Sequence, residues 1–271
     1  MTTENIHGNG IRTVTAGCEF WDSLTPQART NNEPILAGFE TYLVSHFPLN
    51  HDSPFVYKIG RQAMCLGQNI SLRQTDDESC AYIATANGLR VLDEPNINYT
   101  KDALKSRLTE IRSRQLGRLV ELGDILQPAS LLEIFSSGPP YGRFRMEQLK
   151  GEARNDLLVP DIMLELLQRF DRGSVGILSW PYSPRYTLAQ GITFEHARTL
   201  TGFQIRDGRL NINVIDPYER TERPWSFRDL VVAFMFQYTT INNLSANDVN
   251  FLAKSVWLIE KTPPSIQTAS K

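Results

Sequence analysis

Residues 74–84 read Gln74-Thr-Asp-Asp-Glu-Ser-Cys80-Ala-Tyr-Ile-Ala84. This stretch begins as a polar segment and turns, directly after its cysteine, into apolar residues that favour a helix. A thiol in the first turn of a helix lies near unpaired backbone N–H groups and the positive end of the helix dipole, and both favour the thiolate. We therefore interpret Cys80 as a candidate nucleophile. The alternative is a small buried core residue, so a base, an orienting residue and an oxyanion donor must be sought elsewhere.

The residues that follow Cys80 predict a buried central helix. Apolar side chains recur at roughly helical intervals through residues 81–92, with Ile83, Leu89 and Leu92 among them. Gly88 lowers the intrinsic stability of a helix, so its presence indicates a close contact of this helix with another element.

The composition is that of a globular protein with a hydrophobic core. The chain has 271 residues, of which 41% are hydrophobic and 10% aromatic, and this excludes a disordered or fibrous protein. Its formal charge of -2 gives no electrostatic reason to expect nucleic acid or an anionic membrane as a partner. No apolar run approaches the roughly 20 residues of a membrane-spanning helix. We therefore predict neither partner, and the composition leaves the oligomeric state open.

The three cysteines predict neither a disulfide framework nor a metal site. Cys18, Cys65 and Cys80 are widely spaced and show no CxxC or CxxH pattern. We expect free thiols, no metal and no cofactor. The N-terminus lacks the basic and apolar segments of a signal peptide, which predicts a cytoplasmic protein.

The order of patterns along the chain predicts one domain preceded by an arm. Residues 1–32 are rich in Thr, Asn and Gly and lack periodicity, which is typical of a mobile N-terminal arm. Residues 33–271 contain no linker, internal repeat or low-complexity tract. A helix of about three turns is expected between Pro34 and Pro48. Residues 97–172 are expected to be mainly helical.

One predicted helix, at residues 101–122, carries many basic residues. Its apolar side chains form a stripe, and cations such as Lys105, Arg112 and Arg118 lie largely off that stripe. We interpret the cations as the solvated face of an amphipathic helix. A docking surface for an acidic partner is the alternative.

The pattern changes from helical to alternating at residue 174, which predicts strands. Residues 174–180 have the pattern of a buried strand. Residues 193–205 and 209–215 are strand-like runs on either side of Asp207-Gly208, a strong hairpin signal.

The register of this hairpin controls whether His196 and Asp216 share a face of the sheet. A two-residue loop pairs position 199 with 216 and puts the two side chains on opposite faces. A three-residue loop with glycine in the left-handed position pairs 198 with 216, which places His196 diagonally next to Asp216. We therefore predict a loop of odd length or a bulge.

These residues complete a candidate catalytic set. His196 is the one histidine with both a strand setting and a downstream carboxylate, so Asp216 could orient its imidazole while the other ring nitrogen exchanges a proton with a thiol. Gln74 could donate its amide N–H to an oxyanion, together with the backbone N–H of Cys80. Taken singly, His196 would be a structural histidine and Gln74 a surface residue. The chain order Cys, His, Asp favours the catalytic interpretation.

These motifs resemble the papain-like fold and, more narrowly, the C39-like peptidases. That family has an oxyanion-hole glutamine six positions before the nucleophile, which matches Gln74 and Cys80. Its His-containing strand, Gly-aromatic pair and Asp-Pro strand end are similar to residues 196–203 and 213–217. Its following helix is similar to residues 226–234.

The resemblance implies an α+β fold in which the nucleophile helix packs on an antiparallel sheet, with extra helices. The long segment between nucleophile and histidine implies a helical insertion at about residues 97–172. The implied activity is that of a cysteine-dependent amide hydrolase, a thiol protease, with a catalytic triad of Cys80, His196 and Asp216, an oxyanion hole at Gln74, and a protein or peptide substrate.

The same apparatus could deamidate glutamine or transfer an acyl group, as an effector translocated into a host cell and acting on a host protein. A non-catalytic binding protein that retains the fold is the remaining alternative.

Overall fold

The fold is α+β, and it is built on one six-stranded antiparallel sheet. The computed structural model describes residues 21–22, 24–56, 79–93, 98–122, 128–149, 161–179, 197–217, 222–235 and 243–262. In sheet order, the strands are β1 (Phe144–Gln148), β6 (Val256–Lys261), β2 (Val175–Ser179), β3 (Ala197–Arg206), β4 (Arg209–Ile215) and β5 (Glu222–Ser226). Every neighbouring pair is antiparallel. The α+β class expected from the sequence is confirmed.

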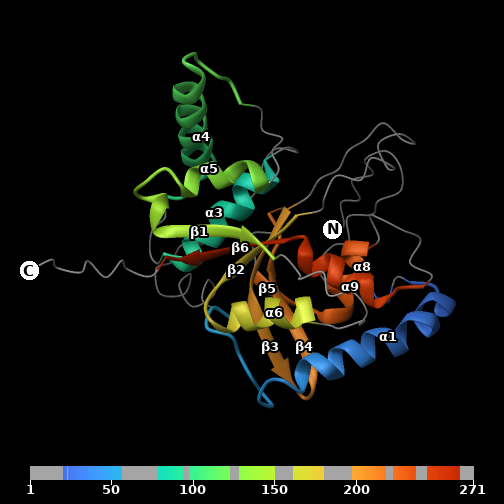
Figure 1. The fold of residues 1–271 in the computed structure, drawn as a ribbon. Helices are drawn as coiled ribbons and strands as arrows, with labels where there is room; N and C mark the ends of the chain where they lie inside the picture. Colours follow the sequence, from blue (N-terminus) through green and yellow to red (C-terminus); the bar gives the residue numbers. More distant parts are fainter. Residues whose placement is uncertain are drawn as a thin grey trace, which may run out of the picture.

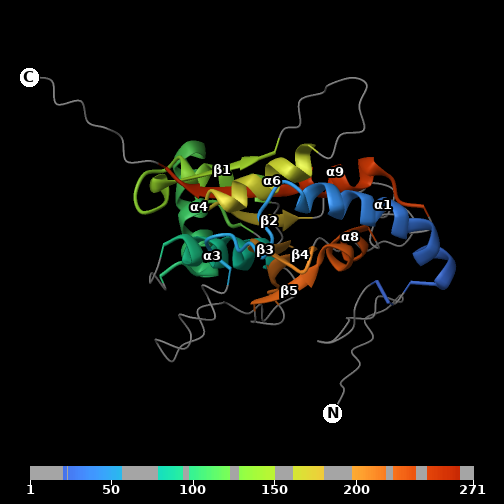
Figure 2. The same cartoon turned by 90° about the horizontal axis from the view of Figure 1, so that it is seen from below.

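Two hydrophobic cores lie against the two faces of the sheet. Alternate residues of a strand point to opposite faces, and in β2 Ile177 belongs to one core and Leu178 to the other. The first, here called the α3 core, includes residues of α3 (Cys80–Leu92), α4 (Lys101–Leu116), η1 (Pro128–Leu131), α5 (Leu132–Phe135) and η2 (Tyr141–Arg143). The second, the α1 core, includes residues of α1 (Pro26–Val44), α6 (Asp161–Asp171), α8 (Phe227–Met235) and α9 (Ala246–Lys254). Figures 1 and 2 show α3 and α4 on one side of the sheet and α1, α8 and α9 on the other.

The central helix predicted from the sequence is α3. All 13 of its residues are buried. A Cβ added at Gly88 would lie 3.4 Å from Ile177 of β2 and 3.6 Å from Ile259 of β6. The glycine therefore marks a close contact, as the sequence indicates, and the contact is with the sheet.

Helix α1 begins at Pro26, within the stretch for which the sequence predicts an arm. Thr25 caps this helix, because its hydroxyl accepts a hydrogen bond from the backbone N–H of Ala28 at 3.2 Å. Proline suits the first helical position, where its missing N–H would have no intrahelical partner. Pro34 lies inside the helix rather than at its start. Residues 26–32 are therefore helical.

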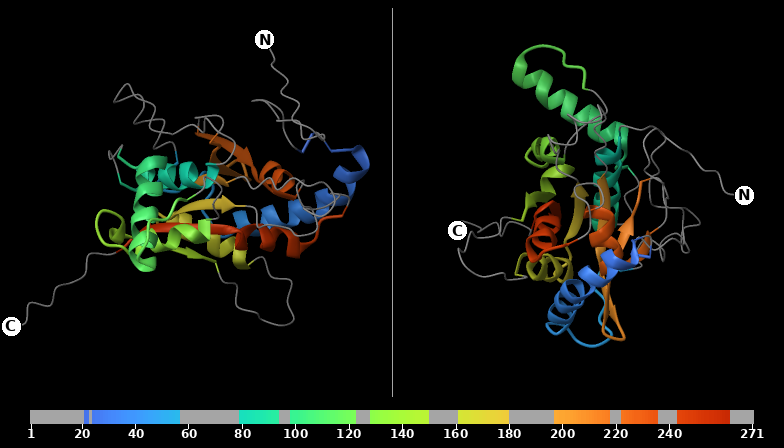
Figure 3. Two further views of the ribbon diagram at one scale, coloured as in Figure 1. Left: turned by 90° about the horizontal axis from the view of Figure 1, so that it is seen from above. Right: turned by 90° about the vertical axis from the view of Figure 1, so that its right-hand side faces the viewer.

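Helix α4 ends at Leu116, earlier than the apolar stripe of the sequence suggests. Gly117 adopts a left-handed conformation with φ 63° and terminates the helix. The chain then folds back along α4, and the backbone N–H of Val120 donates to Ser113 Oγ at 3.0 Å. Figure 1 and the right panel of Figure 3 show α4 projecting from the rest of the molecule.

The stretch 97–172, expected to be mainly helical, also contains strand β1. This strand pairs with β6 in the register Phe144↔Lys261. Its partner lies more than a hundred residues later in the chain, so the local pattern carries no sign of the pairing. None of the described helices is long and apolar enough to cross a membrane.

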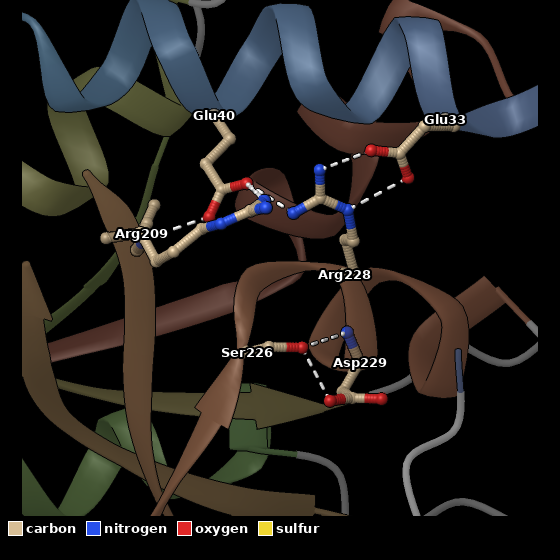
Figure 4. A network of polar contacts seen from close by, with 7 residues as sticks. Glu33, Glu40, Arg209, Ser226, Arg228 and Asp229 are labelled. Carbon is tan, nitrogen blue, oxygen red and sulfur yellow. Dashed lines mark hydrogen bonds and ion pairs between the residues drawn. The ribbon is translucent and has the colours of Figure 1, made fainter. Parts of the chain in front are cut away.

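An ion network fastens α1 to the hairpin and to α8 (Figure 4). We call it the α1 clasp; it consists of Glu33, Glu40, Arg209, Arg228 and the backbone N–H of residue 210. Glu40, whose side chain is 5% exposed, accepts a hydrogen bond from that N–H at 2.9 Å and from Arg209 at 3.3 Å, and it also binds Arg228. Arg228 binds Glu33 at 2.7 Å. Burial lowers the pKa of Arg228, but its bonds to the two carboxylates outweigh burial and raise it.

Candidate functional site

Cys80 occupies the position that the sequence predicts for it, at the head of a helix. It is the first residue of α3 and is 6% exposed. The backbone N–H of Ile83 donates to the carbonyl oxygen of Ser79 at 3.0 Å and closes the first helical turn. The thiol therefore lies in the turn whose backbone N–H groups favour an anion. Cys18 and Cys65 lie outside the described residues.

Helix α3 crosses the sheet so that its cysteine end points toward β4. The hydroxyl of Thr199 in β3 donates to the carbonyl oxygen of Ala84 at 2.8 Å. One turn later, Gly88 lies against Ile259 of β6, on the far side of β2. The end that carries Cys80 is therefore directed away from β6. The last residue of β4 belongs to the same core as Cys80.

The hairpin has a two-residue turn. Arg206 pairs with Arg209, and the turn residues Asp207 and Gly208 have φ values of 49° and 71°. Positive φ at both positions is the geometry of a type I′ turn. The three-residue loop considered from the sequence is therefore wrong.

The bulge, the other form of that prediction, is present in β3. Leu200 pairs with Val214, but Gly202 pairs with Asn213, so Thr201 is an extra residue in its strand. The pairing on the far side of this bulge continues toward positions 198 and 216. This is the register that the hypothesis of a shared His–Asp face requires.

The bulge is held by a segment that follows α1. Gly202 has φ 145°, and a Cβ there would lie 2.1 Å from Ser53 Oγ, so this position requires glycine. Ser53 Oγ accepts a hydrogen bond from the backbone N–H of Phe203 at 2.9 Å, and the Ser53 N–H donates to the Phe203 carbonyl at 3.0 Å. Ser53 therefore joins the bulge to the chain segment next to it.

Asp216 follows β4 and forms an ion pair with Arg198. The Arg198 Nε–H donates to Asp216 Oδ2 at 2.6 Å, and the two side chains are only 12% and 9% exposed. The guanidinium carbon of Arg198 lies 5.1 Å from the centre of the Trp225 ring in β5, within the range of a cation–π contact. The carboxylate at this strand end is thus held by a cation from the opposite strand.

Two of the four predicted site residues, Gln74 and His196, lie outside the described residues. The described histidines bond elsewhere. His46 Nδ1 lies 2.8 Å from the carbonyl oxygen of Tyr42, and His51 Nε2 lies 2.6 Å from a carboxylate oxygen of Asp171 at the end of α6. The structure therefore places Cys80 and Ile215, the last residue of β4, in the same core, while Arg198 and Asp216 lie on the opposite face of the sheet with Trp225. The base and the oxyanion donor stay predictions.

The far end of α3 carries a second polar network. Arg90 Nε donates to the carbonyl oxygen of Tyr99 at 2.7 Å, and burial lowers the pKa of this arginine. The Tyr99 hydroxyl donates to Asp93 at 2.9 Å and accepts a hydrogen bond from Arg143 at 2.8 Å. Burial raises the pKa of Tyr99 to about 12, although the bond from Arg143 opposes this shift. This network anchors the end of α3 that is remote from the cysteine.

Comparison with known proteins does not assign the chain to a family. No protein-family model matches it, and no curated protein matches it. Within the described residues, no three His, Cys, Asp or Glu side chains gather as they would around a metal ion.

Sequence reasoning missed the partner of Asp216. The register argument itself names position 198 as the residue opposite 216, so the arginine there could have been recognised as an ion-pair partner. Trp225 and Ser53 give no such signal, because each reaches the site from a segment whose position only the folded chain defines.

Proposed function

We propose that the chain is a cysteine-dependent amide hydrolase of papain-like, C39-like architecture. His196 takes the proton of the Cys80 thiol, and the thiolate attacks the carbonyl carbon of an amide to form a C–S bond. Gln74 and the backbone N–H of Cys80 donate hydrogen bonds to the oxyanion, and Asp216 orients His196. The amine leaves with the proton from His196, and water then hydrolyses the thioester and restores the thiol.

The thiol of Cys80, buried in the first turn of α3, is the observation that carries the proposal. The catalytic hypothesis requires positions 198 and 216 to oppose each other, and a two-residue turn without a bulge would not achieve this. A supporting observation is the bulge at Thr201, which gives positions 198 and 216 a shared face. That face belongs to the α1 core and Cys80 to the α3 core, so the proposal requires His196 to reach the thiol from beyond the start of β3.

A peptide bond is the default substrate of this apparatus. If the bound group is a glutamine side chain, the same steps release ammonia and deamidate it. If an amine replaces water in the second step, the acyl group is transferred to that amine and a new amide forms. An effector that acts on a host protein would fit either of these outcomes.

Selective alkylation of the thiol tests the proposal. With iodoacetamide, the Cys80 sulfur forms a bond to the methylene carbon and iodide leaves. At pH near 6 we expect Cys80 to react faster than Cys18 and Cys65, as measured by mass spectrometry of the digested protein. His196→Ala should abolish this selectivity, because the thiolate loses its imidazolium partner.

His46→Ala is the matched control, since that imidazole bonds to a backbone carbonyl of its own helix end. Cys80 in the His46→Ala variant should be labelled as fast as in the wild type. Slow and equal labelling of all three cysteines in the wild-type protein would contradict the enzymatic proposal. If Cys80 is selectively labelled, mass spectrometry of substrate trapped on the protein in a lysate would separate peptidase, deamidase and acyltransferase chemistry.

A non-catalytic interaction protein is the second candidate function, favoured by the projection of α4 and its exposed apolar end. Leu116 and Leu119 are 59% and 83% exposed. The cations weigh against a basic docking surface, because Arg107 and Arg114 bind Glu110 and Arg112 binds Glu133. If this candidate is correct, replacing Leu119 with Ser should weaken partner capture while Cys80→Ser leaves it unchanged.

A further inference from the structure

Strand β1 forms one edge of the sheet (Figure 2), and among the described strands only β6 pairs with it. Directly before β1, the carbonyl oxygen of Arg143 accepts a hydrogen bond from the backbone N–H of Thr262 at 2.8 Å, so residue 143 is a hydrogen-bonded position of this ladder. Such positions alternate along an antiparallel pair, which makes 145 and 147 hydrogen-bonded as well. The backbone groups of Phe144, Met146 and Gln148 therefore point away from β6, toward the outer edge.

The outer edge of β1 is open in the described part of the chain. The Phe144 N–H donates back to the carbonyl oxygen of Tyr141 in η2, but the N–H groups of Met146 and Gln148 have no partner among the described residues. A groove lined by residues 146–149 lies here, with Leu132 of α5 and Glu165 of α6 in its walls. An uncovered strand edge is a template on which another strand can pair.

The two charged residues of β1 share one face of the strand and are partly exposed. Phe144 and Met146 belong to the α3 core, so Arg145 and Glu147 face the other side, and their side chains are 54% and 44% exposed. The Arg145 Nε–H binds Glu260 at 2.7 Å, and Glu147 binds an arginine of α6 through one oxygen. The terminal N–H groups of Arg145 and the second oxygen of Glu147 take no part in these two bonds.

The sequence of β1 is complementary to itself in the antiparallel direction. The strand reads Phe-Arg-Met-Glu-Gln, with Met146 at its centre. A two-fold axis beside Met146 places this residue opposite its copy, in the hydrogen-bonded position that its outward backbone groups require. The same axis places Arg145 of each copy opposite Glu147 of the other. These are non-hydrogen-bonded pairs, in which facing side chains come closest.

The charges also select this register against its neighbours. Moving the two copies by one repeat of the ladder in one direction places Arg145 opposite its own copy, and in the other direction it places Glu147 opposite its own copy. Like charges directly opposite each other are destabilising. Moving them by a single residue would face outward backbone groups with groups that already bind β6. The centred register is therefore the one that satisfies both the backbone and the charges.

We infer that β1 is a self-association strand: two copies of the chain pair edge to edge through β1, antiparallel, with Met146 at the two-fold axis, so that the two sheets join into one. The groove beside residues 146–149 receives the strand of the second copy. This inference is independent of the proposed function, because it uses neither Cys80 nor the end of β4.

Charge-swapped variants of the full-length chain test the inference by sedimentation equilibrium. At about 100 μM, where pairing of micromolar affinity is largely populated, the wild type should have twice the 30.8 kDa mass of one chain. Arg145→Glu and Glu147→Arg each place like charges opposite each other at both contacts, so each should weaken dimerisation at least about 10-fold. An equal mixture of the two variants should restore the dimer, because every negative strand then faces a positive one.

Arg114→Glu is the matched control, since it reverses an exposed charge that also binds a carboxylate, that of Glu110 in α4. It should dimerise like the wild type. Gln148→Pro provides a second route where a charge variant does not fold. It removes an outward N–H at a sheet edge, where proline is tolerated, and should also weaken dimerisation. Thermal unfolding followed by circular dichroism checks that each variant is folded.

Three results would overturn the inference. A wild-type chain that stays monomeric would leave this edge to an extended segment of another protein. A dimer that Arg145→Glu, Glu147→Arg and Gln148→Pro all leave intact would place the contact on another surface. A mixture of the two folded charge variants that stays monomeric would show that the charges act only within one chain. None of these results changes the expected labelling of Cys80, so the proposed function is tested separately.

Discussion

Two buried arginine–carboxylate pairs in this molecule share their chemistry and differ in what they connect. In the α1 clasp, Glu40 accepts hydrogen bonds from a backbone N–H and two arginines, and it joins three elements that are distant in sequence. At the end of the hairpin, Asp216 binds Arg198 within a pair of strands that the ladder already joins. Burial of an ion pair therefore does not reveal its use. The number of separate elements that the pair connects is more informative.

The largest loss of stability that we expect comes from breaking the α1 clasp. Glu40→Ala leaves Arg228 with one partner and the backbone N–H of residue 210 with none from the clasp, so the free energy of unfolding should fall by about 3–5 kcal/mol. Urea denaturation measures this loss. Glu33→Ala removes a carboxylate that is 46% exposed and should cost no more than about 1 kcal/mol. Equal losses in the two variants would mean that burial does not set the strength of the clasp.

The second largest effect on stability is expected at the bulge in β3, next to the hairpin end that carries the Arg198–Asp216 pair. Gly202→Ala forces a side chain into φ 145° and against Ser53 Oγ, so we expect a loss of roughly 2–3 kcal/mol in unfolding free energy. If the bulge sets the register of Asp216, labelling of Cys80 should fall as well. Gly38→Ala is the control: it has open space in α1 and should stabilise the protein by about 0.5–1 kcal/mol. A stable Gly202→Ala variant with normal labelling would contradict this account of the bulge.

Tyr99 belongs to a third buried polar network, whose contribution to stability should depend on pH. Its folded-state pKa of about 12 exceeds the ordinary value of 10.0. The unfolded chain therefore loses this proton first as the pH rises, and the folded state loses about 1.4 kcal/mol of stability per pH unit between these values.

Tyr99→Phe should remove that slope while costing about 1–2 kcal/mol at neutral pH through its lost hydrogen bonds. Chemical denaturation at several pH values from 8 to 11 measures both quantities. Parallel stability curves for the variant and the wild type would show that Tyr99 is not the source of the slope.

The smallest effect is expected at a side chain that is exposed to solvent. Leu119→Ser changes a side chain that is 83% exposed, so stability should stay within about 0.5 kcal/mol of the wild type. Leu104→Ala, at a fully buried position of the same helical region, should cost about 2–5 kcal/mol. Thermal or urea unfolding of the two variants checks this contrast. A large loss in Leu119→Ser would indicate that this end of the molecule packs against a second surface.

Local patterns predicted the elements whose cause is local. The start of α3 at Cys80 and strand β2 follow from the change from polar to apolar residues and from the period of the apolar side chains. Helix α8 lies where the family resemblance implies a helix. The need for an odd offset in the hairpin follows from strand alternation alone, and the bulge at Thr201 supplies that offset.

Elements with non-local causes were missed or misplaced. Strand β1 forms by pairing with β6, which lies at the other end of the chain. Helix α1 extends back to Pro26, where its cap is local but its packing against the α1 core is not. No periodicity within a short window contains the information on either partner.

Cys80 in the first turn of a buried helix, and Asp216 at the end of a bulged hairpin, are consequences of sequence order, because helix period and strand alternation act between near neighbours. The partner that Asp216 binds and the support of the bulge by Ser53 depend on folding. Arg198, Trp225 and Ser53 come from three different segments, and only tertiary packing brings their atoms to within hydrogen-bonding or stacking distance.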